Sequence, residues 1–221
     1  MSAVLRVRGV SKSFGPADDL TPVLHGVELT LMPGEKASLI GPSGCGKSTL
    51  LALVAGLLRP DDGTIEIDGV AMSELDETAR ARLRAQRVGI ALQSDNLIPF
   101  LSARENVELA LAFGAQTRAE PRRAARELLD RFEVGHRERH LPRHLSGGEA
   151  QRVSLAVATA NDPALLLADE VVASLDGETA GRVIEEVLSG DFAVLYVTHD
   201  HELADLVQQR YALVDGAVRR R

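Results

Sequence analysis

The sequence contains few aromatic residues and a single cysteine, and each shortage narrows the class of protein. Tryptophan is absent and aromatic residues make up only 3% of the 221 residues, so the core must consist of leucine, valine, isoleucine and alanine. Because Cys45 has no second cysteine to pair with, an internal disulfide is excluded. A lone cysteine fits a protein that works in a reducing compartment such as the cytoplasm.

Long hydrophobic runs are also missing. No stretch of about 18 apolar residues occurs, so we expect no membrane-spanning helix in this chain. The segment Met1–Arg6 lacks a basic stretch followed by an apolar one, so we expect no signal peptide. The formal net charge of −7 argues against a general nucleic-acid-binding surface. The composition is that of a soluble globular protein with one large domain, or one domain and a subdomain.

The most informative stretch that is present is a glycine-rich loop. Its sequence, GPSGCGKST, fits the phosphate-binding pattern G-x-x-x-x-G-K-[ST], with a short strand expected at 36–40 before it and a helix at 48–58 after it. Glycines let such a loop wrap around an anion, which the backbone N–H groups then hold. Lys47 would neutralise the β- and γ-phosphates of a nucleotide, and Ser48 would offer its hydroxyl to Mg²⁺. The expected nucleotide-binding residues are Gly41, Pro42, Ser43, Gly44, Cys45, Gly46, Lys47, Ser48 and Thr49.

Apolar strands alternate with helical segments along most of the chain. Strands at 164–168 and 193–197 are apolar at every position, which is typical of a parallel sheet covered on both faces. A loop at 94–100 is followed by a helical pattern from residue 102 to residue 132, and a further helix ends at residue 160. The sequence therefore predicts an α/β fold, with a core made of residues 1–93 and 161–221 and a helical insert made of residues 94–160.

Polar residues stand where the predicted strands end, which is where ligands of parallel sheets bind. Asp169 would hold Mg²⁺ through water, and Gln93 would reach Mg²⁺ or the attacking water. Glu170 would accept a proton from that water, and His199 would donate a hydrogen bond to the γ-phosphate. Each residue alone could be an ordinary strand end, but their placement together with a phosphate loop favours catalysis.

Phe14 has two interpretations. It follows a strand and precedes Gly15, and taken alone it is most simply a residue at the edge of the core. The alternative is a platform on which a purine base stacks, because an aromatic face attracts another π-system.

The segment Ser146–Gln151, SGGEAQ, resembles the signature motif that defines ATP-binding cassette (ABC) proteins. The resemblance covers the whole chain, since the phosphate loop, Gln93, the signature, Asp169 with Glu170, residues 174–176 and His199 come in the family's order. It implies a P-loop NTPase (RecA-like) core with a mainly parallel sheet, an antiparallel β-subdomain and an inserted all-helical subdomain. One departure is Val171-Val172, which stands where the family usually has Pro-Thr.

The resemblance also implies two copies joined head to tail, with ATP and Mg²⁺ held between the phosphate loop of one and the signature of the other. Ser146, Gly147 and Gly148 would then grip the γ-phosphate at a helix N-terminus. Phe14 matches the family's adenine-stacking aromatic residue, and Asp176 matches the loop that couples the two sites. The catalytic residues would be Lys47, Gln93, Glu170 and His199, and the metal-binding residues would be Ser48, Gln93 and Asp169.

Within the family, the segments at 96–99 and 105–109 are similar to stand-alone cassettes of the lipoprotein-releasing, macrolide-exporting and cell-division groups. This likeness implies an ATPase on the cytoplasmic face of the inner or plasma membrane, which drives a separate membrane subunit that docks near Gln93–Phe100. No nucleic-acid partner is expected.

Two alternatives differ in class from a transport ATPase. A soluble ABC ATPase acting on DNA or the ribosome would usually carry a coiled-coil insert, zinc-binding cysteines or a second cassette, and the sequence shows none of these. A cassette that only binds ATP would not need Lys47, Asp169, Glu170 and His199, all of which are present.

Overall fold

The computed structural model describes residues 2–92, 97–114, 120–171, 175, 177–199, 201–207 and 209–221. Of the predicted site residues, Gln93 and Asp176 lie outside this part of the chain. The chain divides into a first unit, residues 1–84 and 192–221, and a second unit, residues 85–191. The predicted helical insert falls within the second unit, and its own bounds stay a prediction.

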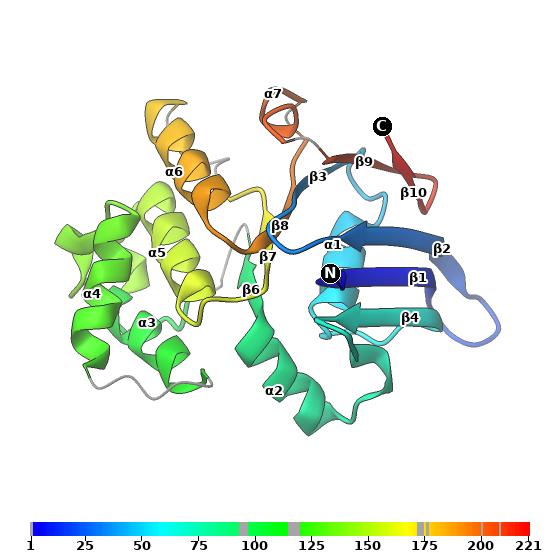
Figure 1. The fold of residues 1–221 in the computed structure, drawn as a ribbon, viewed down its shortest axis with the longest axis horizontal. Helices are drawn as coiled ribbons and strands as arrows, with labels where there is room; N and C mark the ends of the chain where they lie inside the picture. The colour runs from blue at the N-terminus through cyan, green and yellow to red at the C-terminus, as the bar shows by residue number, and fades with distance from the viewer. Residues whose placement is uncertain are drawn as a thin grey trace. The chain divides into compact units, whose positions relative to one another are not determined.

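The first unit begins with an antiparallel sheet, drawn in blue to teal in Figure 1. In spatial order its strands are β2 (Thr21–Leu31), β1 (Leu5–Phe14), β4 (Asp62–Ile67) and β5 (Val70–Ala71). β1 buries Leu5 and Val7, while Arg6 and Arg8 are more exposed, as alternation in a half-covered strand requires. The register shifts between Val7 and Val10, where Gly9 takes a φ of 59°.

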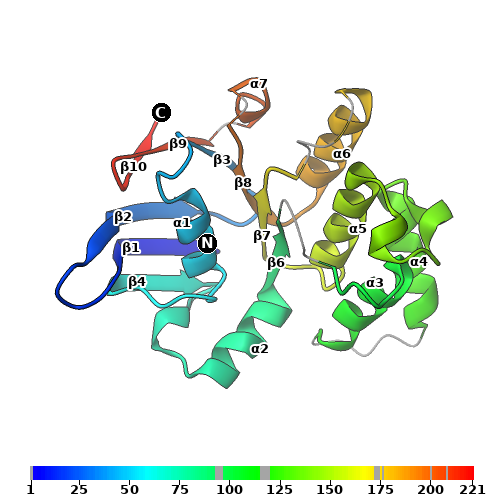
Figure 2. The same cartoon turned by 180° about the vertical axis from the view of Figure 1, so that it is seen from behind.

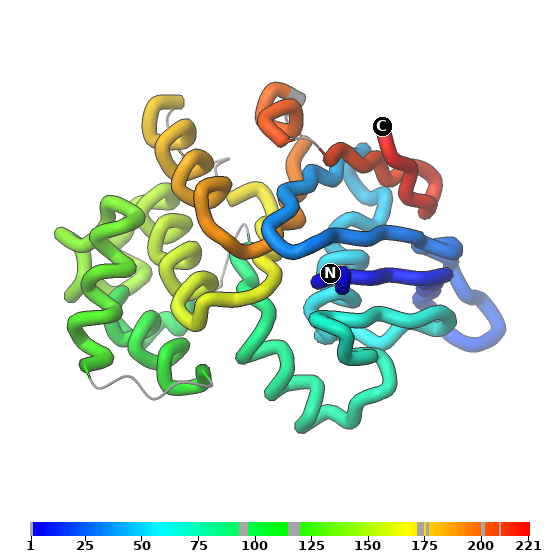
Figure 3. Tube along the Cα trace, in the orientation of Figure 1, coloured from blue at the N-terminus to red at the C-terminus, as the bar shows by residue number. Residues whose placement is uncertain are grey.

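The other strands of the first unit are mainly parallel. In spatial order they are β10 (Ala217–Arg220), β9 (Gln209–Val214), β3 (Lys36–Ile40) and β8 (Ala193–Val197). β3 runs parallel to β8 and β9, whereas β10 pairs antiparallel with β9. All five residues of β8 are buried, which explains its unbroken apolar sequence. The Cα trace in Figure 3 shows that both ends of the chain belong to this unit.

Two expectations about the helices of the first unit need correction. Helix α1 (Lys47–Val54) ends four residues before the predicted end at residue 58, because Gly56 has a left-handed φ of 66°, which terminates helices. The charged sequence from Met72 to Arg87 predicts a single surface helix, but the structure has the short helix η1 (Met72–Glu74) followed by α2 (Glu77–Arg87). Arg80 of α2 is buried, because its stem packs against Gly56. The short helix α7 (His201–Ala204) follows β8.

The second unit holds a strand pair and the helices that Figure 2 shows in green to orange. Its strands β6 (Val88–Ala91) and β7 (Leu165–Asp169) are parallel, with Ala91 opposite Ala168. The α-helices are α3 (Ala103–Ala112), α4 (Pro121–Arg131), α5 (Gly147–Thr159) and α6 (Gly177–Ser189), and the 3₁₀ turns are η2 (Gly135–Arg137) and η3 (Pro142–His144). The core of this unit includes Val107, Leu129, Phe132 and Leu155.

Two local features of the second unit explain its packing. Ser102 and Glu105, three residues apart ahead of an apolar pattern, predict a capping box at the start of α3, and it is present: the Ser102 side chain accepts from the Glu105 N–H and Glu105 accepts from the Ser102 N–H. Gly89 lets α5 approach β6 closely, since a Cβ there would lie 2.3 Å from the Ala158 carbonyl oxygen. Within the part of the chain that the structure describes, every helix is too short or too polar to cross a membrane.

Candidate functional site

The phosphate loop lies between β3 and α1 in the first unit, as the sequence predicts. Gly46 is the N-cap of α1 with a φ of 102°, and Gly44 also has a left-handed φ of 78°. No side chain caps this helix and its first turn carries no acidic residue. The N–H groups at the start of α1 are therefore left for an external acceptor, and the positive end of the helix dipole favours an anion.

Two of the loop glycines are required by close neighbours. A Cβ at Gly41 would lie 2.5 Å from the Leu213 carbonyl oxygen of β9 and 2.8 Å from Cys45 Sγ. A Cβ at Gly46 would lie 3.0 Å from Val23 Cγ1 of β2, with a Leu24 methyl group at 3.1 Å. The loop is thus packed tightly against two strands, and a side chain at either position would push it out of shape.

Lys47 folds back over the loop. Its Nζ donates to the carbonyl oxygens of Gly41 at 2.8 Å and Pro42 at 2.9 Å, and it lies 4.0 Å from Cys45 Sγ. Among the described residues no carboxylate pairs with this ammonium group, so its charge is available to an anionic ligand. Ser48, in the first turn of α1, is exposed. A loop with uncapped N–H groups, an ammonium group and an exposed hydroxyl fits a triphosphate with its magnesium ion.

The carboxyl end of β8 adds His199 to the same edge of the sheet. β3 and β8 are parallel with Leu39 opposite Val197, and the Thr198 N–H donates to the Leu39 carbonyl at 3.3 Å. The phosphate loop and the exposed His199 therefore leave the sheet side by side. The structure brings these two predicted parts of the site together within the first unit.

Phe14 ends β1, where it pairs with Thr21 of β2, and 42% of it is exposed. The Lys12 ammonium lies 5.6 Å from the ring centroid. The ring is therefore not enclosed in the core, and part of its surface can contact a ligand. This exposure favours the interpretation as a stacking platform over that of a residue at the edge of the core.

Asp169 and Glu170 follow each other at the end of β7 in the second unit. Glu170 has a φ of 49°, and a left-handed conformation in a residue that is neither glycine nor asparagine costs on the order of 1–2 kcal/mol. Its carbonyl oxygen accepts a hydrogen bond from Gln151 Nε2 at 3.3 Å, and Gln151 is only 5% exposed. Because β6 and β7 are parallel with Ala91 opposite Ala168, the carboxyl ends of both strands lie at the same edge.

Sequence reasoning missed the part that Gln151 plays. It belongs to the segment SGGEAQ, but nothing in that pattern shows that its side chain is buried or that it contacts Glu170. The one signal was helical spacing, because Gln151 lies three and four residues before Ser154 and Leu155, which are both buried.

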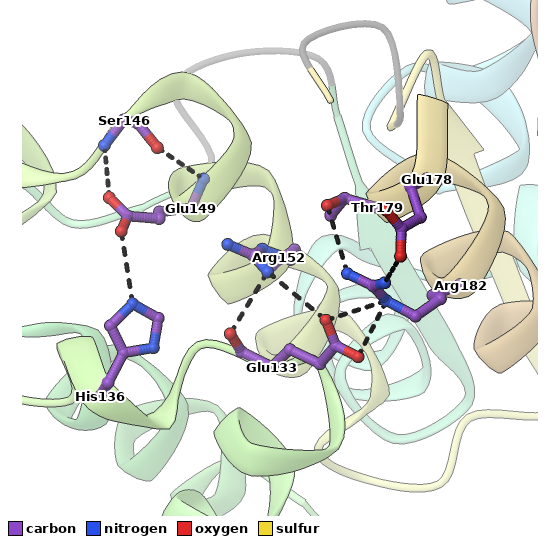
Figure 4. A network of polar contacts seen from close by, with 8 residues as sticks. All are labelled: Glu133, His136, Ser146, Glu149, Arg152, Glu178, Thr179 and Arg182. Atoms are coloured by element: carbon purple, nitrogen blue, oxygen red, sulfur yellow. Dashed lines mark hydrogen bonds and ion pairs between the residues drawn. The ribbon is translucent and has the colours of Figure 1, made fainter. Parts of the chain in front are cut away.

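The signature segment forms the N-terminus of α5. Ser146 is the N-cap: its Oγ accepts from the Glu149 N–H at 3.2 Å, while Glu149 Oε2 accepts from the Ser146 N–H at 2.8 Å (Figure 4). The pKa of Glu149 is lowered to about 2. The larger cause is the hydrogen bond from the Ser146 N–H, and the next is the hydrogen bond from the Arg137 side chain. Gly147 and Gly148 form the first turn, so no side chain shields the N–H groups there.

A second set of polar contacts joins α5 to α6, and sequence reasoning did not foresee it. Figure 4 shows Glu133 between Arg152 of α5 and Arg182 of α6. Arg152 Nη1 donates to the Glu133 carbonyl at 3.2 Å, and Arg182 Nε lies 3.1 Å from Glu133 Oε1. Arg182 also pairs with Glu178 at 2.8 Å. These contacts tie the signature helix to the helix that follows residue 176.

Asn106 holds the described end, residues 97–100, of the segment predicted to dock a membrane partner. The Asn106 side chain accepts from the Ile98 N–H at 2.7 Å and donates to the carbonyls of Ile98, Leu101 and Ser102. Leu97 and Ile98 are half-buried, whereas Pro99 is exposed and Phe100 is 77% exposed. Asn106 is 5% exposed, so a buried amide fixes the backbone that presents the Phe100 ring.

Comparison with known proteins decides the family. A family model described as "ABC transporter" matches residues 24–173. This chain belongs to the ABC transporter family. The expected resemblance is confirmed, and it covers both the phosphate loop and the signature.

Relatives of this ABC protein match it along nearly its whole length. It is 43% identical to the lipoprotein-releasing system ATP-binding protein LolD 1 of Rhodopirellula baltica, over 99% of this chain and 97% of that protein. It is 41% identical to the uncharacterized ABC transporter ATP-binding protein YbbA of Escherichia coli K12, over 96% and 95%. The dimeric ATP-binding cassette MJ0796, solved in a post-hydrolysis state with ADP and phosphate, has a TM-score of 0.92 at 35% identity over 98% and 97%.

These matches confirm the predicted α/β P-loop NTPase fold and the predicted activity. This ABC protein is an ATP-binding subunit and an ATPase. The roles of its individual residues are not tested by the comparisons and stay predictions.

Proposed function

We propose that two copies of this ABC protein close around ATP and Mg²⁺ and so drive a separate integral membrane subunit. The observation that carries the proposal is the near full-length match to ATP-binding proteins of lipoprotein-releasing systems, at 43% identity to LolD 1 of Rhodopirellula baltica. The similar cassette MJ0796 is a dimer with ADP and phosphate, which supports a dimer here.

In this proposal the first unit binds the nucleotide. The backbone N–H groups of Gly41–Thr49, except at Pro42, which has none, and the Lys47 ammonium hold the phosphates, and Ser48 contributes its hydroxyl to the metal. Phe14 stacks on the adenine, and His199 donates to the γ-phosphate. When bound, Mg²⁺ would supply charge neutralisation to the phosphates. Asp169 would hold it through water, Gln93 would reach the metal or the attacking water, and Glu170 would accept the proton of that water.

The signature of the second copy completes each site in this proposal. Ser146, Gly147 and Gly148 offer the N-terminus of α5 to the γ-phosphate of the nucleotide that the first copy holds. The left-handed Glu170 supports this coupling, because Gln151 of the signature helix donates to its carbonyl. Asp176 lies in the segment that couples the two sites.

We place the membrane partner against Gln93–Phe100, on the cytoplasmic face of the membrane. The exposed Pro99 and Phe100 support this placement, because a large apolar side chain held in a fixed position suits a protein contact. The alternative of a soluble ATPase acting on DNA or the ribosome is less well supported, since the similar curated proteins are named as transporter subunits.

Retention by membranes tests the proposal. Tagged protein expressed in its own host should co-purify with an integral membrane protein, and Phe100→Glu should lose that partner. Phe113→Glu is a matched control, because Phe113 is also exposed, at 65%, but lies at the other end of α3. The ATPase rate of each purified variant shows whether the fold is intact. Recovery with ribosomes or DNA in place of a membrane protein would contradict the proposal.

A further inference from the structure

The acidic residue of the signature creates an electrostatic conflict if the proposed function is right. Glu149 lies in the first turn of α5, and its Oε2 accepts from the Ser146 N–H at 2.8 Å. A carboxylate at this place stabilises the helix. The same helix end is proposed to receive a γ-phosphate, however, and two anions at one helix N-terminus repel each other.

Arg137 meets the other oxygen of this carboxylate. Its Nε donates to Glu149 Oε1 at 2.7 Å, across twelve positions of sequence. The Glu149 side chain is only 12% exposed, so water screens its charge poorly and the guanidinium is the main counter-charge. His136 Nε2 lies 3.5 Å from the same oxygen, but an imidazole carries a charge only when protonated.

The place of Arg137 is set by the backbone around it. Arg137 ends η2, where its N–H donates to the Val134 carbonyl at 2.9 Å, and the His140 N–H donates to the Arg137 carbonyl at 2.8 Å. A guanidinium stays charged at every relevant pH, so it neutralises Glu149 continuously. The two oxygens of Glu149 therefore have different partners: Oε2 accepts from the Ser146 N–H, and Oε1 accepts from Arg137 Nε.

We propose that Arg137 is a positioning residue of the signature: by binding Glu149 it cancels the carboxylate charge and lets the start of α5 accept the phosphate of the opposing copy. Arg137 itself does not touch the nucleotide. This inference rests on the proposed composite site, and it adds a residue that lies outside every motif of the sequence. A glutamine at position 149 would make the same cap without the charge, and would then need no arginine.

A double-mutant cycle tests this inference. The KM for ATP is measured at about pH 8, where imidazoles are mostly neutral, for the wild type, Arg137→Gln, Glu149→Gln and the double variant. We expect Arg137→Gln to raise the KM by ~10-fold, as the loss of a charge-assisted contact implies, with kcat changed less. In the Glu149→Gln background the same change should raise the KM by no more than ~2-fold. Added salt should partly restore Arg137→Gln, because it screens the repulsion.

Three controls separate this role from a structural one. Arg139→Gln removes a neighbouring arginine that is 83% exposed and 3.6 Å from Glu138, and it should behave as the wild type. Arg137→Lys keeps the charge and should lose less than Arg137→Gln. If Arg137→Gln does not fold, the double variant, which has no unpaired carboxylate, should fold and bind ATP.

If Arg137→Gln raised the KM for ATP equally in the wild-type and Glu149→Gln backgrounds, or in neither, the role of Arg137 would be overturned. The proposed function would not be affected by that result. Absence of ATP hydrolysis in the wild type and in Arg139→Gln would instead overturn the proposed function together with this inference.

Discussion

The packing of the phosphate loop gives a prediction whose size can be worked out from the structure. Gly46→Ala places a Cβ 3.0 Å from Val23 Cγ1 and 3.1 Å from a Leu24 methyl group, in a backbone with φ of 102°. Gly44→Ala meets nothing within 4 Å, although its φ of 78° is also left-handed. The pair therefore separates backbone strain from crowding.

Strain alone costs about 1–2 kcal/mol, and crowding in a packed region adds about 1–3 kcal/mol. We expect Gly44→Ala to lower the free energy of unfolding by about 1–2 kcal/mol and Gly46→Ala by about 2–5 kcal/mol. Urea unfolding of both variants at 25 °C, with the slope checked for constancy, measures the difference. ATP affinity should fall more for Gly46→Ala, because the first turn of α1 is displaced. If Gly44→Ala were the more destabilising variant, the account of the loop packed against β2 would be wrong.

Three further predictions follow from single contacts. Phe14→Ala should raise the KM for ATP by ~10-fold or more with little change in kcat, because a base stack contributes about 1–3 kcal/mol to ground and transition states alike; an unchanged KM would return Phe14 to the edge of the core. The pKa of Glu149 is held at about 2, below its usual value, so its contribution to stability is fully present above about pH 4.5 and is lost as the pH falls toward 2. Denaturant unfolding should therefore show on the order of 1–3 kcal/mol of acid-dependent loss that Glu149→Gln removes, and an identical pH dependence in that variant would count against the contact. Asn106→Ala should lower the free energy of unfolding by about 1–3 kcal/mol and weaken membrane retention, because it leaves the Ile98 N–H without its acceptor; retention equal to the wild type would show that this loop does not dock the partner.

Local patterns in the sequence predicted much of the fold. The phosphate loop lies between a strand and a helix as expected, and the capping box at Ser102 is present, because both depend on neighbours within a few residues. The strands at β7 and β8 were found from unbroken apolar runs, since a strand covered on both faces has no polar alternation to display.

Contacts between distant residues could not be predicted in this way. The pair Arg137 and Glu149 is twelve residues apart, and Arg182 and Glu133 are forty-nine apart. Whether such charges meet depends on how helices pack, and the sequence pattern only marks them as a solvated face. The left-handed φ of Glu170 and the buried Arg80 are of the same kind, because tertiary packing overrides what the residue type prefers.

The central claim is that the phosphate loop of one copy and the signature of another hold the same ATP. Two variants test it, one carrying Ser43→Cys and the other Gly147→Cys, each with Cys45→Ser so that no other thiol is present. The two pools are mixed and treated with a short thiol cross-linker, with and without ATP under conditions that prevent hydrolysis. The account predicts an ATP-dependent link between two chains in the mixture. A single chain that carries both cysteines and links to itself, or a mixture that does not respond to ATP, would contradict it.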